Sequence, residues 1–262
     1  MRTTIPADGL PMPDLWKAPL DRPLVIAHRG GAALAAENTI AAIRAAEAAG
    51  ADAIETDIRA TSDGALVCVH DADLLRLCNN PRAVADLDLT ELRQVLPGVM
   101  TLAEALGATG TIGILLDFKL ADESALLDVI DEIERSPVSR NALLGLRSLP
   151  LICAARSRSH LPILAFLDSE DLIDDAVAAG ANWFRLWQGW TSRDSVSAVQ
   201  GAGMHAAIMV GQPRSVPLPE YPPFPVGVVD AAGLARIAQT RPDAILLDDP
   251  RLLRAPASPV AL

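Results

Sequence analysis

Two carboxylates stand in the middle of an otherwise apolar segment, residues 53–58, whose composition is typical of a β-strand. Side chains alternate between the two faces of a strand, so Glu55 and Asp57 point the same way, about 7 Å apart. Burying two like charges is costly unless a cation neutralises them, and oxygen ligands alone favour Mg²⁺ or Ca²⁺ over zinc. We therefore predict one divalent cation, Mg²⁺ or Ca²⁺, at this pair; the alternative is an internal salt bridge that involves Arg59.

A third carboxylate and an ammonium group accompany a second apolar segment, residues 112–117. Asp117 and Lys119 are two positions apart, so on a strand they share a face. An ion pair between the two is one interpretation. Together with Glu55 and Asp57, however, they predict a third metal ligand, Asp117, and a cation, Lys119, for a phosphate oxygen.

Two histidines stand at the ends of short apolar runs. His28 opens the sequence His-Arg-Gly-Gly directly after residues 24–27, and His70 ends a later run. Imidazoles titrate near neutral pH, so the pair is able to serve as base and acid. Arg29 suits an anionic group, and the two glycines allow the backbone to approach a ligand closely. The alternatives are a structural turn with a solvated arginine and a histidine held by ordinary hydrogen bonds.

Other polar and aromatic side chains have mainly structural interpretations. Asn38 precedes a helical pattern and is expected to cap its N-terminus, as Thr90 is in a later turn. Glu37 has either a capping or solvated role or a place in the site. Trp187 is expected to pack in the core, with a stacking wall for a ligand as the alternative.

The composition describes a folded protein with an acidic surface. Of 262 residues, half are apolar and 21% are charged, which excludes a disordered chain, and the net charge is −11. Such a surface repels phosphate backbones, so we expect no nucleic acid partner. The three cysteines lack metal-binding spacing and are expected to be buried thiols. We find no signal peptide and no apolar run of about 18 residues, so we expect no membrane span and a cytoplasmic location. The sequence leaves the oligomeric state open.

Strand-like runs alternate with helical patterns from residue 24 onward. This alternation predicts βαβ units and a parallel sheet, and eight runs in about 225 residues favour a (β/α)8 barrel over an open doubly wound sheet. The expected strands are 24–27, 53–58, 112–117, 142–146, 162–166, 183–186, 205–210 and 244–247, and helices are expected at 39–49, 121–134, 169–179, 192–202 and 231–239. We expect a single domain, 1–262, with an N-terminal arm (1–22), an insertion (71–100) and a Pro-rich loop (211–227).

The chemistry-bearing residues also occur in the order and spacing of a known family. The sequence resembles the glycerophosphodiester phosphodiesterases, whose fold is a (β/α)8 barrel with a small insertion after the second strand. The resemblance is carried by His28-Arg-Gly-Gly with Glu37-Asn-Thr, Ile54-Glu-Thr-Asp-Ile, Asp63-Gly with Val69-His-Asp, Leu87-Asp-Leu-Thr-Glu-Leu, Thr101-Leu-Ala-Glu-Ala and Asp243-Ala-Ile-Leu-Leu-Asp-Asp-Pro. It covers residues 24–251 and is most specific in the N-terminal third.

The resemblance implies metal-dependent hydrolysis of a small-molecule glycerophosphodiester to an alcohol and glycerol 3-phosphate. The implied roles are acid–base catalysis for His28 and His70, metal binding for Glu55, Asp57 and Asp117, and phosphate binding for Arg29 and Lys119. By the same resemblance, His28 is the base of the first step and His70 is the acid.

Three features depart from the family pattern. Asp117 stands where the family usually has Glu, as in the related sphingomyelinase D group, whose lyase reaction stops at a cyclic phosphate and is an alternative function. Residues 207–211 lack the frequent Trp-Thr pair, and the Pro-rich loop could narrow the substrate mouth. An alternative of another class is a barrel that binds metal or phosphate without catalysis; the presence of both histidines and all three acids disfavours it.

Overall fold

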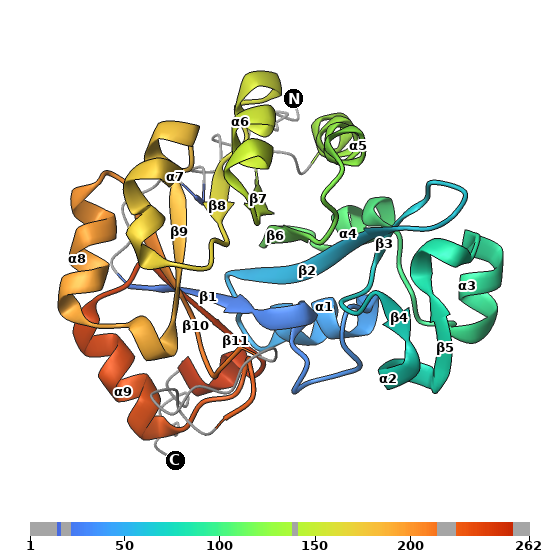
Figure 1. Ribbon diagram of the computed structural model, residues 1–262. Helices are drawn as coiled ribbons and strands as arrows, with labels where there is room; N and C mark the ends of the chain where they lie inside the picture. The colour runs from blue at the N-terminus through green and yellow to red at the C-terminus, as the bar shows by residue number, and fades with distance from the viewer. Residues whose placement is uncertain (1–14, 17–21, 138–140, 214–223, 254–262) are drawn as a thin grey trace, which may run out of the picture.

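Eight parallel strands form a closed barrel, which confirms the predicted (β/α)8 fold (Figure 1). The computed structural model describes residues 15–16, 22–137, 141–213 and 224–253, and the statements below concern these residues. The first strand pairs with both the second and the last barrel strand, so the sheet closes on itself. In chain order the barrel strands are β1 (Leu24–Ala27), β2 (Ala53–Ala60), β6 (Gly113–Phe118), β7 (Ala142–Leu146), β8 (Ile163–Ala165), β9 (Trp183–Trp187), β10 (His205–Met209) and β11 (Ala244–Leu247).

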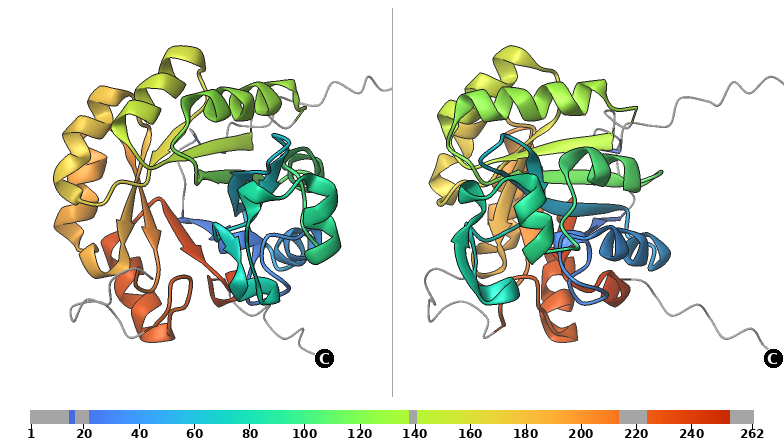
Figure 2. Two further views of the ribbon diagram at one scale, coloured as in Figure 1. Left: turned by 45° about the vertical axis from the view of Figure 1, so that its right-hand side comes forward. Right: turned by 90° about the vertical axis from the view of Figure 1, so that its right-hand side faces the viewer.

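Helices cover the outside of these strands, and Figure 2 shows them as an arc around the barrel. They are α1 (Ile40–Ala48), α4 (Leu102–Ala108), α5 (Glu123–Arg135), α6 (Leu149–Arg158), α7 (Ile173–Ala179), α8 (Arg193–Gly201) and α9 (Ala231–Thr240). Side-chain caps fix where several of them begin; the Thr39 hydroxyl, for example, accepts a hydrogen bond from the Ala42 N–H at 3.2 Å. The five predicted helical segments all contain a helix. Periodicity did not predict α6, because its apolar residues do not gather on one face.

The barrel interior changes from apolar to polar along the strands. Ile26 on β1 and Leu115 on β6 pack inside the barrel with the inward residues of the other strands. Because side chains alternate along a strand, the next inward positions toward the C-terminal ends belong to His28 and Asp117. The same alternation that fills the core therefore brings the polar residues to one end of the barrel.

An insertion after β2 adds a small layer beside this end, on the right of Figure 1. It contains β3 (Leu66–Cys68), which pairs antiparallel with β2, and then β4 (Asp73–Leu74), α2 (Leu75–Cys78), β5 (Asn80–Ala83) and α3 (Leu89–Val95). The predicted N-cap Thr90 is wrong. Asp88 caps α3, since its carboxylate accepts from the Glu91 N–H at 2.8 Å while the Glu91 side chain accepts from the Asp88 N–H at 3.2 Å.

The opposite end of the barrel is closed by a tryptophan from the predicted N-terminal arm. Trp16 is 1% exposed and donates its indole N–H to the Asn141 carbonyl at 2.8 Å. Its ring meets that of Trp183 edge-on, and Gly113 provides the space, because a Cβ there would lie 2.8 Å from the Trp16 ring. Apart from Leu15, Trp16 and Arg22, the arm lies outside the described residues, as does most of the Pro-rich loop.

The cysteines are less uniform than the sequence predicts. Cys68 is buried, which raises the pKa of its thiol to about 12, but Cys78 is half-buried and Cys153 is exposed. The expectation of three buried thiols is therefore wrong for two of them, and all three are free. None of the helices in the described ranges combines the length and the apolar character that a bilayer crossing requires.

Candidate active site

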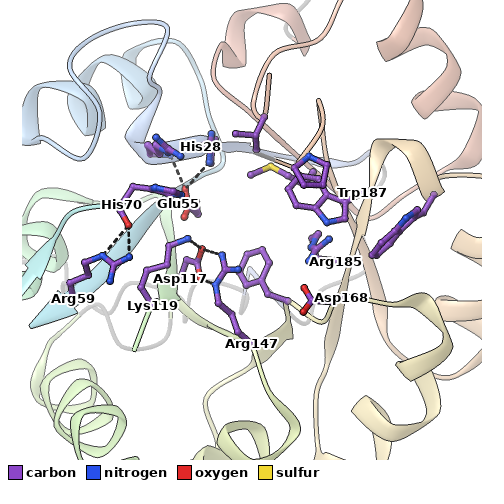
Figure 3. A pocket seen from close by; sticks show the side chains of 16 residues that line it. His28, Glu55, Arg59, His70, Asp117, Lys119, Arg147, Asp168, Arg185 and Trp187 are labelled. Atoms are coloured by element: carbon purple, nitrogen blue, oxygen red, sulfur yellow. Dashed lines mark hydrogen bonds and ion pairs between the residues drawn. The ribbon is translucent and has the colours of Figure 1, made fainter. Parts of the chain in front are cut away.

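A cavity of about 550 Å³ lies at the C-terminal ends of the barrel strands (Figure 3). Charged side chains on or near the C-terminal ends of β1, β2, β6 and β7 line one side, and the other side contains Arg185, Asp168 and Trp187. The cavity is lined by most of the predicted site residues, namely His28, Arg29, Glu55, His70, Asp117 and Lys119. In this architecture the loops at the C-terminal ends of the strands carry the chemistry.

The three predicted acids converge beside this cavity. Asp57 and Asp117 are register partners on β2 and β6, and Glu55 lies two residues before Asp57 on the same face of β2. One ligand oxygen from each lies within 4.8 Å of those of the other two, and all three side chains are buried. Three buried carboxylates at this spacing fit a hard divalent cation such as Mg²⁺ or Ca²⁺.

Asp57 is held as a carboxylate by its neighbours. The Lys119 ammonium lies 2.9 Å from Oδ1, and the Asn38 amide donates to Oδ2 at 2.8 Å. Burial alone would raise the pKa of Asp57, but the surrounding positive charges, led by Lys119, hold it well below its usual range. Asp57 is therefore ionised at neutral pH.

The predicted N-cap role of Asn38 is wrong. The helix is capped by Thr39, whereas Asn38 is buried in the left-handed conformation, with φ 55°. Its amide oxygen accepts from the Thr56 hydroxyl at 2.7 Å while its amide nitrogen donates to Asp57. Asn38 thus fixes the orientation of Asp57, a candidate metal ligand. The sequence did not indicate this role, because Asn38 lies next to the helix start at Thr39.

Asp117 contacts two cations. Lys119 forms an ion pair with Oδ2, and the guanidinium of Arg147, just after β7, donates from Nε to Oδ1 at 2.9 Å. Burial opposes ionisation, yet Lys119 and Arg147 together lower the pKa of Asp117 below its usual value. Lys119, predicted as a phosphate cation, therefore lies between two of the acids.

Glu55 has a different environment from the other two acids. Its Oε2 accepts the backbone N–H of Arg29 at 2.8 Å and lies 3.9 Å from Nε2 of His28. Burial, followed by repulsion from Asp57, raises the pKa of Glu55 to about 7. Of the three acids, Glu55 is therefore the one whose charge a bound cation would stabilise most.

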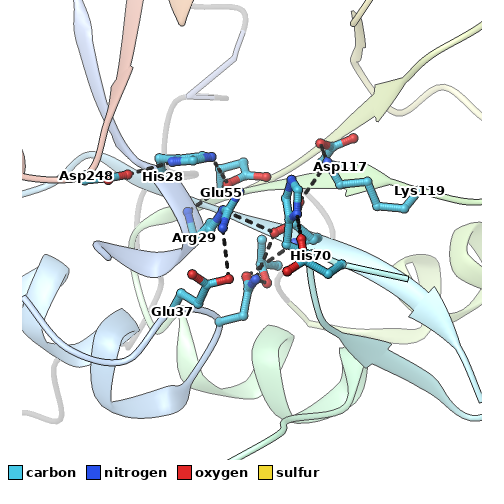
Figure 4. A network of polar contacts seen from close by, with 12 residues as sticks. His28, Arg29, Glu37, Glu55, His70, Asp117, Lys119 and Asp248 are labelled. Carbon is cyan, nitrogen blue, oxygen red and sulfur yellow. Dashed lines mark hydrogen bonds and ion pairs between the residues drawn. The ribbon is translucent and has the colours of Figure 1, made fainter. Parts of the chain in front are cut away.

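The two histidines have matching carboxylate partners. Nδ1 of His28 lies 2.6 Å from Asp248, just after β11, and Nδ1 of His70 lies 2.6 Å from Asp71. Figure 4 shows His28 between Asp248 and Glu55, with His70 on the side of Glu55 that faces away from Asp248. A carboxylate on Nδ1 favours the tautomer that carries its proton there, so Nε2 of the neutral ring is left as a proton acceptor.

His70 is neutral in the free protein. Burial, reinforced by the nearby charge of Lys119, lowers the pKa of His70 to about 4, although Asp57 and Asp71 oppose this shift. At pH 7 the ring therefore needs an added negative charge nearby before it carries a proton.

Arg29 is bent toward the acids by its own backbone. Its φ is 52°, in the left-handed region, and Gly30 (φ 77°) follows where a Cβ would lie 3.2 Å from the Cβ of Ala42. The buried guanidinium donates from Nη1 to Glu37 at 2.9 Å. Glu37 in turn accepts from Arg76 of α2 at 2.6 and 2.8 Å, so its role is an ion-pair network rather than a cap.

Several residues of the site were not predicted from the sequence. Arg147 and Asp248 directly follow barrel strands, and this position was the signal that could have marked them. Arg59, predicted as the alternative partner of the acids, donates instead to the His70 carbonyl at 2.8 and 2.9 Å. Trp187, expected in the core, packs against the inner core and also lines the cavity.

Sequence comparison finds a family that resembles the N-terminal half of the barrel. The model of the "Glycerophosphoryl diester phosphodiesterase family" matches residues 28–136. This part of the chain is therefore similar to that family. A glycerophosphodiester phosphodiesterase from Caldanaerobacter subterraneus is 45% identical over 76 residues, which are 29% of the chain and 31% of that protein. Human glycerophosphodiester phosphodiesterase 1 is 44% identical over 79 residues, 30% of the chain and 24% of the relative. The matched segment thus spans less than a third of either relative.

Solved glycerophosphodiester phosphodiesterases share the fold along most of the chain. The enzyme from Thermotoga maritima matches with a TM-score of 0.70 and 19% identity, over 88% of this chain and 97% of that one. A phosphodiesterase from Oleispira antarctica, solved with the product sn-glycerol-3-phosphate, matches with a TM-score of 0.75 and 20% identity, over 88% and 94%. At such identities the likeness concerns the fold.

Proposed function

We propose that the protein hydrolyses glycerophosphodiesters to an alcohol and glycerol 3-phosphate, using one divalent cation and two histidines. The arrangement that carries this proposal is a pair of imidazoles, His28 and His70, each oriented by a carboxylate and placed beside three buried acids. The similarity of residues 28–136 to the glycerophosphoryl diester phosphodiesterase family supports the substrate class, as does the product named for the Oleispira structure. A cytoplasmic location stays a prediction from the sequence.

The acids would hold the cation, Mg²⁺ or Ca²⁺, through Glu55, Asp57 and Asp117. When bound, it neutralises phosphate charge and polarises a non-bridging oxygen. Lys119 contributes by keeping Asp57 and Asp117 ionised, and thus able to act as ligands, at neutral pH. The contacts of Lys119 with Asp57 and Asp117 support this role in the acidic cluster at least as strongly as they support direct binding of the phosphate by Lys119.

Arg29 is the side chain best suited to the phosphate. Its Nε and Nη2 are buried and have no hydrogen-bond partner among the described residues, with Nε 4.0 Å from Asp57. Buried N–H groups without a partner are costly, so a phosphate oxygen there would recover a charge-assisted hydrogen bond. Glu37 holds the guanidinium in place through Nη1.

Proton transfer is assigned to the two Nε2 atoms. Nε2 of His28 accepts the proton of the attacking hydroxyl, which belongs to water or to the glycerol of the substrate. If the glycerol hydroxyl attacks, a cyclic phosphate forms as the alcohol leaves, and water opens it to glycerol 3-phosphate in a second step. Nε2 of His70 donates a proton to the oxygen of the departing alcohol as the P–O bond breaks. Because His70 is neutral in the free protein, it takes up this proton when the anionic substrate raises its pKa.

The test is turnover of a panel of glycerophosphodiesters, with glycerophosphocholine and glycerophosphoethanolamine among them, in Mg²⁺, Mn²⁺ or Ca²⁺. Phosphorus NMR follows the products, and Glu55→Gln serves as the matched inactive control. We expect glycerol 3-phosphate and free alcohol. Accumulation of a cyclic phosphate as the end product would assign a lyase, and binding without turnover would assign a non-catalytic barrel.

A further inference from the structure

The end of the Pro-rich loop contacts both the cavity and the carboxylate partner of His28. Val226 is buried and lines the cavity, whereas the next residue, Gly227, is not part of the lining. The Gly227 carbonyl instead accepts the Asp248 N–H at 2.8 Å. Oδ1 of Asp248 in turn lies 2.6 Å from Nδ1 of His28, and Figure 4 shows the two side chains together. This part of the loop therefore reaches the proposed base through a single intervening residue.

Gly227 also lies so close to the side chain of Asp248 that no Cβ fits between them. A Cβ on Gly227 would overlap Oδ1 and Cγ of Asp248 and would lie 2.7 Å from Oδ2. The backbone of Asp248 is held on both sides, because its N–H binds Gly227 and its carbonyl accepts the Ala33 N–H at 3.2 Å. An added Cβ would therefore move the carboxylate, which lies at the end of a side chain, and with it the oxygen that pairs with His28.

The backbone around Gly227 is fixed by hydrogen bonds to the chain that follows β10. The Gly227 N–H donates to the Val210 carbonyl at 2.9 Å, and the Gln212 N–H donates to the Phe224 carbonyl at 3.1 Å. With φ 86°, Gly227 is also in the left-handed region, which favours glycine independently of its neighbours. Gly227 therefore keeps its place against Asp248 unless the end of the loop detaches from the barrel.

We propose that Gly227 is a positioning residue for the base, because its backbone holds the Asp248 carboxylate against Nδ1 of His28. The proposal rests on the proposed function in one respect: the contact affects turnover only if His28 acts as the base. The end of the Pro-rich loop thus helps to orient the base, besides lining the cavity through Val226.

The test replaces Gly227 by alanine, and the matched control is Gly203→Ala. Gly203 has nearly the same conformation, φ 84°, but a Cβ there would meet no other atom within 4 Å. Both variants therefore carry comparable backbone strain, and only Gly227→Ala displaces Asp248. We expect kcat of Gly227→Ala on an alkyl glycerophosphodiester to fall by about tenfold or more, the worth of a hydrogen bond to a charged group. KM should change much less, and Gly203→Ala should keep the wild-type kcat.

A double variant shows whether the effect passes through the carboxylate. In Gly227→Ala/Asp248→Ala the added Cβ no longer meets a carboxylate, so kcat should equal that of Asp248→Ala alone. The same comparison covers a Gly227→Ala protein that folds poorly, because its loss of Tm should be smaller in the Asp248→Ala background. A loss of kcat on Gly227→Ala that is equally large with and without the Asp248 carboxylate would overturn the proposal.

Histidine NMR distinguishes a failure of this proposal from a failure of the proposed function. The chain has four histidines, and the signals of His28 are those that disappear in His28→Gln. Long-range ¹H–¹⁵N spectra report the tautomer of each ring, so Gly227→Ala should shift His28 toward the form with its proton on Nε2, and Gly203→Ala should not. This shift in a protein that hydrolyses no glycerophosphodiester would retain the positioning role and refute the proposed function. An unchanged His28 spectrum in Gly227→Ala would overturn the positioning role.

Discussion

A substitution of Asp248 tests the proposed role of His28 while leaving the histidine itself unchanged. Its carboxylate lies 2.6 Å from Nδ1 of His28, and the histidine is 4% exposed. The change Asp248→Asn keeps the shape of the side chain. An amide, however, is able to donate to Nδ1 and thereby favours the tautomer with the proton on Nε2, where the base needs a lone pair.

The expected loss follows from two effects. A hydrogen bond to a charged group contributes about 1.5–3 kcal/mol, which is about 10- to 150-fold in rate if it is lost only when the imidazolium forms. The wrong tautomer adds to this loss, and an analogous carboxylate-to-amide change in the serine protease triad costs about 10⁴-fold in kcat. We therefore expect kcat to fall by about 10²- to 10⁴-fold, with KM changed much less.

The assay uses an alkyl diester and a p-nitrophenyl diester, with Asp71→Asn as the matched variant at His70. A good leaving group needs little acid catalysis, so Asp71→Asn should lose activity on the alkyl diester and recover most of it on the activated one. Asp248→Asn should stay impaired on both, because the nucleophile still has to be deprotonated. Thermal melts check that both variants are folded.

Two outcomes would contradict this reasoning. A kcat of Asp248→Asn within about threefold of wild type, a change of under 1 kcal/mol, would mean that Asp248 does not set the tautomer of a catalytic base. Rescue of Asp248→Asn on the activated diester, without rescue of Asp71→Asn, would exchange the roles of the two histidines.

Three further predictions concern charge. Chelation with EDTA should abolish turnover and a divalent ion should restore it; full activity of metal-free protein would contradict the cation site. Burial raises the pKa of Glu55 from its ordinary 4.5 to about 7. Between these two pH values, the folded metal-free protein in EDTA binds more protons than the unfolded chain, so the free energy of unfolding falls as the pH rises. Glu55→Gln should therefore melt higher than wild type at pH 8 and no higher at pH 5; a gain of equal size at both pH values would exclude this cause. Arg76 pairs with both Glu37 and Asp71, so Arg76→Gln should lower kcat by about tenfold. The control is Arg93→Gln, which breaks an exposed ion pair with Glu104 and should leave kcat unchanged. Equal effects of the two variants on kcat would mean that the ion pairs of Arg76 do not support catalysis.

The sequence predicted the parts of the site that depend on strand periodicity. Glu55 and Asp57 could be placed on one face because a strand has a period of two, and Asp117 joined them because parallel strands end at the same side of a barrel. The eight strands could be counted for the same reason, since each is a short apolar run between helical patterns.

What the sequence did not predict depends on loop conformation and on contacts between distant strands. Asn38 is of a residue type that often caps helices. Only its left-handed backbone conformation shows that its amide turns inward to Asp57. Arg147 and Asp248 find their partners across strands, at separations of 30 and 220 residues. No local pattern encodes such pairs, because they exist only when the barrel is closed.

The contact between His28 and Asp248 joins the two ends of the folded chain. His28 directly follows the first barrel strand and Asp248 directly follows the last, and these two strands pair along the line where the barrel closes. During synthesis, the base of the proposed reaction therefore cannot be oriented until nearly the whole barrel has left the ribosome. Recovery of activity during refolding should accordingly report the docking of β11, so a nascent or truncated chain that lacks this strand would be kept inactive.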